Sequence, residues 1–236
     1  MDAAATPGVD IRRAAARYRG GDAAAGIETR HAFSFSGFYD PDNLRFGPLT
    51  ACNEELLAPG AGYAEHAHRD LEIVTWVVEG ELTHRDSAGN ATMVRPGDLQ
   101  RLTTGALAHH VERNDGDAPL RFLQMWLVPD TPGGDTEYTV VRALAAGVDH
   151  RLPRTDATLR VARPEPGEEV PFPDAPLAEL HVVRGAAHLG ADRLAPGDEV
   201  RIAAPPDRRP PLTGAAPGTE LLLWGLRPAA PPAAPA

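Results

Sequence analysis

The chain has 236 residues, of which 42% are hydrophobic and 24% are charged, and its formal net charge is −10. These proportions are typical of a globular protein. The length suits one large or two modest hydrophobic cores, and we expect two domains. The acidic balance would repel a phosphate backbone, and the arginines are scattered along the chain. We therefore expect no direct binding to nucleic acid.

The sequence contains no membrane or export signal that we recognise. No stretch approaches the roughly 18 consecutive apolar residues that span a bilayer. The first residues, MDAAATPGVDIRR, lack the apolar core of a signal peptide. We expect no membrane association and a cytoplasmic location. The single cysteine, Cys52, cannot form an internal disulfide, and we interpret it as a buried, unreactive thiol.

Short apolar and β-branched runs, separated by Gly, Pro, Asn and Asp, dominate the chain. This pattern is typical of an all-β sandwich or barrel. Helical patterns cover only 11–18 and 138–146, and both are too short or too rich in alanine to decide the fold class. The first group of expected strands comprises 71–78, 81–85, 91–95, 99–103, 108–112 and 120–127. Together they predict an antiparallel barrel.

A weaker copy of this pattern follows in the second half, with expected strands at 159–162, 178–183, 187–190, 199–203 and 221–224. The tripeptide Pro-Gly-Asp occurs at 96–98 and again at 196–198, each time after a hairpin closed by glycine and before a strand. This recurrence indicates an internal duplication. We predict an N-terminal barrel over 1–135, a C-terminal barrel over 136–228 and a disordered Pro/Ala tail over 229–236.

Two pairs of polar residues in the first half have the spacing of metal ligands. His66 and His68 are two residues apart, as are His110 and Glu112. Alternation along a strand directs both members of each pair to the same face. Three imidazoles and one carboxylate suit Fe(II), Mn(II), Co(II), Ni(II), Cu(II) or Zn(II) better than Mg(II) or Ca(II). The spacing therefore predicts one transition-metal site in the first barrel.

The run HAHRDLEIVTWVVEGELTHRDSAGN, continued by VRPGDLQRLTTG and AHHVERN, resembles the pirin family of cupins. The resemblance extends over about Ile11 to Arg227 and implies two tandem cupin, jelly-roll-like β-barrels. It also implies that His66, His68, His110 and Glu112 hold the metal, because they match the family's His-x-His-Arg and His-Ser-Glu segments. Val111 stands where serine is usual. The second barrel has no such set, so we expect it to bind no metal.

Several neighbouring residues leave alternatives open. Glu72 follows His68 by four residues, a spacing from which other cupins take their carboxylate ligand. The family match favours Glu112, and it leaves Glu72 as a residue that orients a ligand histidine. His109 is expected to face away from His110, and His84 to hold the turn that follows it.

The resemblance implies an activity. Some bacterial pirin-like proteins open flavonols such as quercetin with O2, and this metal-dependent dioxygenase reaction is the leading functional hypothesis. Fe(II) is the first choice of metal, and Glu112 would act as both ligand and catalytic base. The alternative is a non-enzymatic, metal-binding or redox-sensing regulator that acts through a protein partner. Expected aromatic walls of a substrate pocket are Phe33, Phe35, Phe38, Tyr39 and Phe46.

Overall fold

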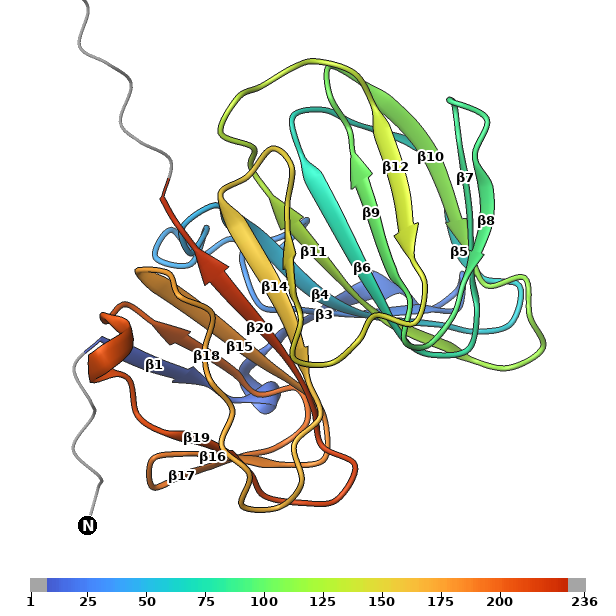
Figure 1. Cartoon of the computed structure of the whole chain (residues 1–236). Helices are drawn as coiled ribbons and strands as arrows, with labels where there is room; N and C mark the ends of the chain where they lie inside the picture. Colours follow the sequence, from blue (N-terminus) through green and yellow to red (C-terminus); the bar gives the residue numbers. More distant parts are fainter. Residues whose placement is uncertain (1–7, 229–236) are drawn as a thin grey trace, which may run out of the picture.

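The computed structural model describes residues 8–228, which form two β-lobes side by side (Figure 1). Every pairing between the named strands is antiparallel. The all-β prediction is therefore confirmed. Among these residues no helix is long and apolar enough to cross a membrane.

The first lobe is a barrel of two sheets. Its seven-stranded sheet contains, in spatial order, β12 (Glu137–Val141), β9 (Leu99–Thr103), β6 (Glu72–Glu79), β11 (Leu120–Leu127), β4 (Leu49–Leu57), β3 (Ile27–His31) and β2 (Tyr18–Asp22). Its four-stranded sheet contains β5 (Gly62–His68), β10 (Ala108–Arg113), β7 (Leu82–Asp86) and β8 (Ala91–Val94).

The second lobe repeats this plan with fewer strands. Its six-stranded sheet contains β1 (Val9–Arg12), β18 (Glu199–Ile202), β15 (Leu177–Arg184), β20 (Glu220–Leu226), β14 (Ala157–Ala162) and β13 (Asp149–Arg151). Its three-stranded sheet contains β17 (Asp192–Leu194), β16 (Ala187–Leu189) and β19 (Leu212–Gly214). Two short 3-10 turns, η1 (Ala14–Ala16) and η2 (Pro206–Arg208), complete the described elements.

The buried apolar residues form three cores. One lies inside each barrel, and the third joins the two large sheets face to face, with Trp76 of β6 and Trp224 of β20 both fully buried in it. Alternation on β6 explains this arrangement, because Val74 and Trp76 face the second lobe and Val77 faces the interior of the first. The shared core fixes the two barrels against each other.

The two Pro-Gly-Asp turns have equivalent contacts, which supports the internal duplication. Asp98 accepts hydrogen bonds from Arg142 Nη1 at 2.6 Å and from the backbone N–H of Ala143 at 3.1 Å. Asp198 accepts the same two kinds of bond from Arg13 Nη1 and the N–H of Ala14, both at 2.8 Å. Each docking segment directly follows a strand of the same lobe, β12 in the first and β1 in the second. From there the chain continues into the other barrel.

The positions of β1 and β12 bear on the expected domain boundary between residues 135 and 136, which stays a prediction. β12, which lies after that boundary, pairs with β9 in the first lobe, and β1 pairs with β18 in the second. The helical patterns at 11–18 and 138–146 were misleading, because so short a helix is costly to nucleate and a sheet edge is available to both segments. The expected tail at 229–236 lies outside the described residues.

Candidate metal centre

Three imidazoles converge where β5 and β10 pair. His110 lies directly opposite His66 in the register, and Ala108 lies opposite His68. The ring centroids of His66 and His110 are 4.4 Å apart, and that of His68 is 4.8 Å from His66 and 5.1 Å from His110. One ring nitrogen from each histidine lies within 4.8 Å of the other two. The structure thus brings together all three histidines that the spacing selected.

Several ring nitrogens of these histidines lack protein partners. Neither Nδ1 nor Nε2 of the buried His110 is hydrogen-bonded, and Nε2 of His68 is also buried and unpaired. Nδ1 of His66 lies 2.8 Å from the carbonyl oxygen of Ala64. Because a carbonyl only accepts, Nδ1 of His66 carries the proton and Nε2 offers a lone pair. Buried polar groups are nearly always satisfied, so this set fits a bound cation.

The charge state of the histidines suits metal binding. Burial, together with the neighbouring imidazoles of His66 and His84, lowers the pKa of His110 to about 3. Burial and the same kind of histidine neighbours lower the pKa of His68 to about 4. Both rings are therefore neutral at pH 7. Metal ions bind the neutral imidazole, so no proton has to leave these two rings first.

Glu112 lies next to this cluster on β10, where two amides hold it. Gln100 Nε2 donates to Oε1 at 2.9 Å, and Gln124 Nε2 donates to Oε2 at 2.7 Å. Glu112 falls in a second group of possible ligands, with His84 and His110, and not in the group of His66 and His68. The structure therefore places the carboxylate beside one predicted ligand and farther from the other two.

His84 belongs to the site as well, which the sequence did not reveal. It lies on β7 opposite Glu112 and stacks on Tyr138, with ring centroids 4.2 Å apart. Its Nε2 contacts Asp86 Oδ2 at 3.3 Å, as expected for a residue that holds the turn. Its Nδ1 is buried and unpaired. Its role could have been found only from the pairing of β7 with β10, the strand that carries His110 and Glu112.

Glu72 does not orient a ligand histidine, so that expectation is wrong. Its Oε1 accepts a hydrogen bond from Thr103 at 3.2 Å, and burial raises its pKa. On β6 it shares the face of Val74, which packs toward the second lobe. The alternation of side chains along β5 does not continue to Glu72, because β5 ends at His68 and Asp70, in the turn that follows, has a φ of 53°. The two residues stand on different strands and different sheets.

A cavity of about 700 Å³ opens beside the cluster. His66, His68 and Glu112 line it on one side, and Phe35 and Phe38 line it elsewhere. Of the other expected aromatic walls, Phe33 and Phe46 pack in the core between the lobes and Tyr39 is 77% exposed.

Trp126 forms an aromatic wall of the cavity that the sequence did not single out. Its ring meets those of His68 and Phe35 edge to face, at centroid distances of 4.8 and 4.9 Å. It is the next inward-facing residue after Gln124 on β11, and its Nε1 donates to Gln124 Oε1 at 2.9 Å. The tryptophan therefore connects the histidine cluster, the amide that holds Glu112 and the cavity.

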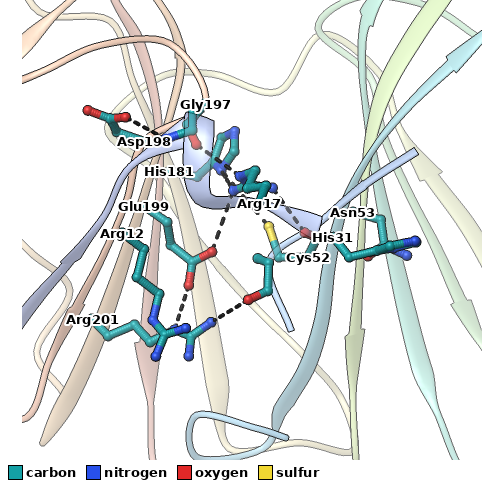
Figure 2. A network of polar contacts seen from close by, with 12 residues as sticks. Arg12, Arg17, His31, Cys52, Asn53, His181, Gly197, Asp198, Glu199 and Arg201 are labelled. Carbon is teal, nitrogen blue, oxygen red and sulfur yellow. Dashed lines mark hydrogen bonds and ion pairs between the residues drawn. The ribbon is translucent and has the colours of Figure 1, made fainter. Parts of the chain in front are cut away.

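A third group of donors, Cys52, Glu179 and His181, is buried between the two lobes. Arg17 already occupies it, with Nη2 2.8 Å from His181 Nδ1 and Nη1 3.2 Å from the carbonyl oxygen of Cys52 (Figure 2). Burial also raises the pKa of the Cys52 thiol, which keeps it protonated. The guanidinium of Arg17 therefore already bonds one of the three donors, His181, whereas both oxygens of Glu179 are unpaired. The prediction that Cys52 is a buried thiol is confirmed.

Comparison with known proteins relates the chain to one family. A model of the family Pirin matches residues 11–127. A Mycobacterium tuberculosis protein named "Putative quercetin 2,3-dioxygenase" is 39% identical over an alignment of 239 positions, which covers 94% of this chain and 96% of that protein. An Escherichia coli protein named "Quercetin 2,3-dioxygenase" is 34% identical over 113 residues, 48% of this chain and 49% of that protein.

The fold agrees with these matches. The crystal structure of the bacterial pirin YhhW from Escherichia coli in complex with nickel(II) superposes with a TM-score of 0.84 and 25% identity, and covers 93% of this chain and 99% of that one. The superposition includes both lobes, so the arrangement of two joined barrels is common to the two proteins.

Proposed function

Because the chain belongs to the pirin family, we propose that it is a metal-dependent dioxygenase that opens flavonols such as quercetin with O2. His66, His68, His110 and Glu112 would hold one divalent transition metal ion. Curated relatives named as quercetin 2,3-dioxygenases support the reaction, and the nickel(II) complex of the E. coli pirin supports the metal.

The observation that carries this proposal is the convergence of three imidazoles beside a cavity, with Nε2 of His68 and both ring nitrogens of His110 buried and unpaired. Apolar burial alone would not favour such a group, because each unpaired buried nitrogen costs free energy. A bound cation would give all three imidazoles a partner. Glu112 would complete the set through its position beside His110, and the amides of Gln100 and Gln124 would fix the plane of its carboxylate.

Fe(II) is our first choice for the metal, since nitrogen and carboxylate donors with open positions suit it, and Ni(II), Mn(II), Co(II), Cu(II) and Zn(II) fit the same donors. When bound, the metal ion would act as a Lewis acid toward a substrate oxygen and leave positions open for O2. His66 and His68 are only half-buried and line the cavity. This access favours a substrate-binding role over a purely structural one.

The side chains around the cavity would hold and activate the substrate. Trp126, Phe35 and Phe38 offer aromatic faces for a flat ring system. Glu112 would take the proton of the flavonol hydroxyl through the oxygen lone pairs that the two glutamine amides leave free. Trp126 would hold the substrate against the histidines, because it contacts His68 directly.

The test has two stages. Chelator-treated protein is reloaded with each of Fe(II), Mn(II), Co(II), Ni(II) and Cu(II) and titrated with quercetin without O2, and the flavonol absorbance band should shift. Admission of air should then consume O2 and remove the band. His110→Ala protein should show neither effect, whereas His109→Ala protein should show both. An unchanged spectrum and no O2 uptake with any metal would refute the dioxygenase function.

A further inference from the structure

Two adjacent glutamates on β4 are both buried, but their surroundings differ. Glu54 faces the second lobe, where Arg121 Nε lies 2.6 Å from Oε1. Glu55 points the other way, into the cavity, and is only 4% exposed. Among residues 8–228 no arginine or histidine forms an ion pair with Glu55. Two hydroxyl groups donate hydrogen bonds to it instead. The carboxylate therefore lacks the countercharge that its neighbour has.

The two hydroxyls bind the same oxygen of Glu55. Thr29 Oγ1 and Tyr63 OH each donate to Oε2 at 2.6 Å. Oε1 has no hydroxyl donor and lies on the wall of the cavity, and the Asn53 side chain is a weaker hydrogen-bond partner of the carboxylate. Burial raises the pKa of Glu55 to about 7, against the lowering effect of these hydrogen bonds. A buried carboxyl group that is held in place, faces a cavity and lacks a cation is better explained by ligand binding than by stability.

The position of Glu55 relative to the histidines suggests its ligand. Glu55 belongs to the seven-stranded sheet, whereas His66, His68 and His110 belong to the four-stranded sheet. The cavity touches both sheets, and Trp126 lines it as well. Tyr63 links the two groups, since its hydroxyl donates to Glu55 and its ring centroid lies 6.2 Å from that of His66. A flat aromatic molecule with one oxygen at the histidines would therefore share the cavity with Glu55.

We propose that Glu55 is a second anchoring point for the substrate, where its Oε1 accepts a hydrogen bond from a phenolic hydroxyl remote from the metal. This inference rests on the proposed flavonol reaction and adds a substrate preference to it. The site selects flavonols that carry hydroxyls on the outer ring. Thr29 and Tyr63 act as positioning residues, since they hold Oε2 and so direct Oε1 toward the cavity.

The test compares two flavonols that differ only in the outer ring: quercetin, with two hydroxyls on it, and galangin, with none. Both are titrated into full-length, Ni(II)-loaded protein without O2. At pH 8, where a carboxyl group with a pKa of about 7 is mostly ionised, wild type should bind quercetin about tenfold more tightly than galangin, as expected for a hydrogen bond to a charged group. Glu55→Gln and Glu55→Ala should lose this preference and keep their affinity for galangin. The control Glu28→Gln removes the same charge from an exposed position on β3 and should keep the preference for quercetin.

The outcomes separate this inference from the proposed function. A preference for quercetin that persists in both Glu55 variants, or that is absent from wild type, would overturn the anchoring role and leave the dioxygenase function standing. An equal loss of both affinities in the Glu55 variants would also overturn it, because Glu55 would then only shape the cavity. Failure of wild type to bind either flavonol would overturn the proposed function and the anchoring role together.

Discussion

His66 and His110 lie directly opposite each other in the antiparallel pair β5–β10, with their ring centroids 4.4 Å apart. This register places both imidazoles on the inner face of the four-stranded sheet. Because side chains alternate along a strand, a slip of one residue would turn His110 outward and His109 inward. The metal centre proposed for this protein therefore depends on the register of one strand pair.

The alternation gives a matched pair of variants. His110→Ala removes an imidazole whose two nitrogens are unpaired, whereas His109→Ala removes a partly exposed ring on the opposite face of the same strand. We expect the affinity for Ni(II), measured by competition with a chelating dye, to fall by more than about 100-fold in His110→Ala, since the loss of even an outer partner of a ligand costs up to that much. It should stay unchanged in His109→Ala. Equal effects would contradict the assignment.

The two buried glutamates Glu112 and Glu72 make a second matched pair. Glu112 lies beside His110, whereas Glu72 faces the second lobe and contacts Thr103. Metal content after purification without chelators should therefore drop sharply in Glu112→Ala and little in Glu72→Ala. The reverse result would show that the carboxylate ligand comes from β6.

The sequence predicted many of the strands and the histidine cluster because both depend on local alternation. His110 lies within an expected strand, whereas His66 and His68 lie on β5, which was not among the expected strands, and only their spacing of two residues indicated a common face. Glu72 was misjudged because its strand is separated from that of His68 by a turn that breaks the alternation. His84, Glu55 and Trp126 could not be assigned, because their roles depend on which strands become neighbours.

The pairing of β1 with the second lobe was equally hidden. Nothing in the residues Val9–Arg12 indicates a partner about 190 positions away, and the short pattern around them suggested a helix. The pairing is accompanied by the docking of Arg13 on Asp198, a long-range contact that mirrors the docking of Arg142 on Asp98. Only the repeated Pro-Gly-Asp tripeptide pointed to this relationship.

Arg17 should hold the two lobes together. Its buried guanidinium contacts the carbonyl oxygen of Gly197 at 2.9 Å, that of Cys52 at 3.2 Å and Glu199 at 3.5 Å (Figure 2). Arg17→Met would remove the buried partner of Glu199 Oε2 and of these carbonyl groups, although Arg201 would still pair with Glu199 Oε1. The free energy of unfolding in urea should therefore fall by about 3–5 kcal/mol. Arg95→Met, which removes an exposed ion pair with Glu81, should cost less than about 1 kcal/mol. Similar losses in both variants would show that Arg17 has no special role.

Glu55 should make the stability of the metal-free protein depend on pH. Its pKa is raised from 4.5 to about 7 in the folded protein, so the folded state binds more protons than the unfolded state between these values. The free energy of unfolding should therefore fall as pH rises from about 4.5 to 7, and Glu55 should contribute on the order of 2 kcal/mol to this fall.

Urea unfolding at pH 5, 6, 7 and 8 measures this contribution. Glu55→Gln cannot ionise, so its stability relative to wild type should increase with pH and level off above pH 7. Glu28→Gln should run parallel to wild type. A constant difference between Glu55→Gln and wild type across this range would mean that Glu55 does not change its protonation on folding.

The most direct test of the metal centre is an anomalous difference map from a crystal of the full chain loaded with Ni(II). We predict one strong peak, about 2.0–2.2 Å from ring nitrogens of His66, His68 and His110. A map without a peak at these three imidazoles, or with its main peak between Cys52, Glu179 and His181, would contradict the account.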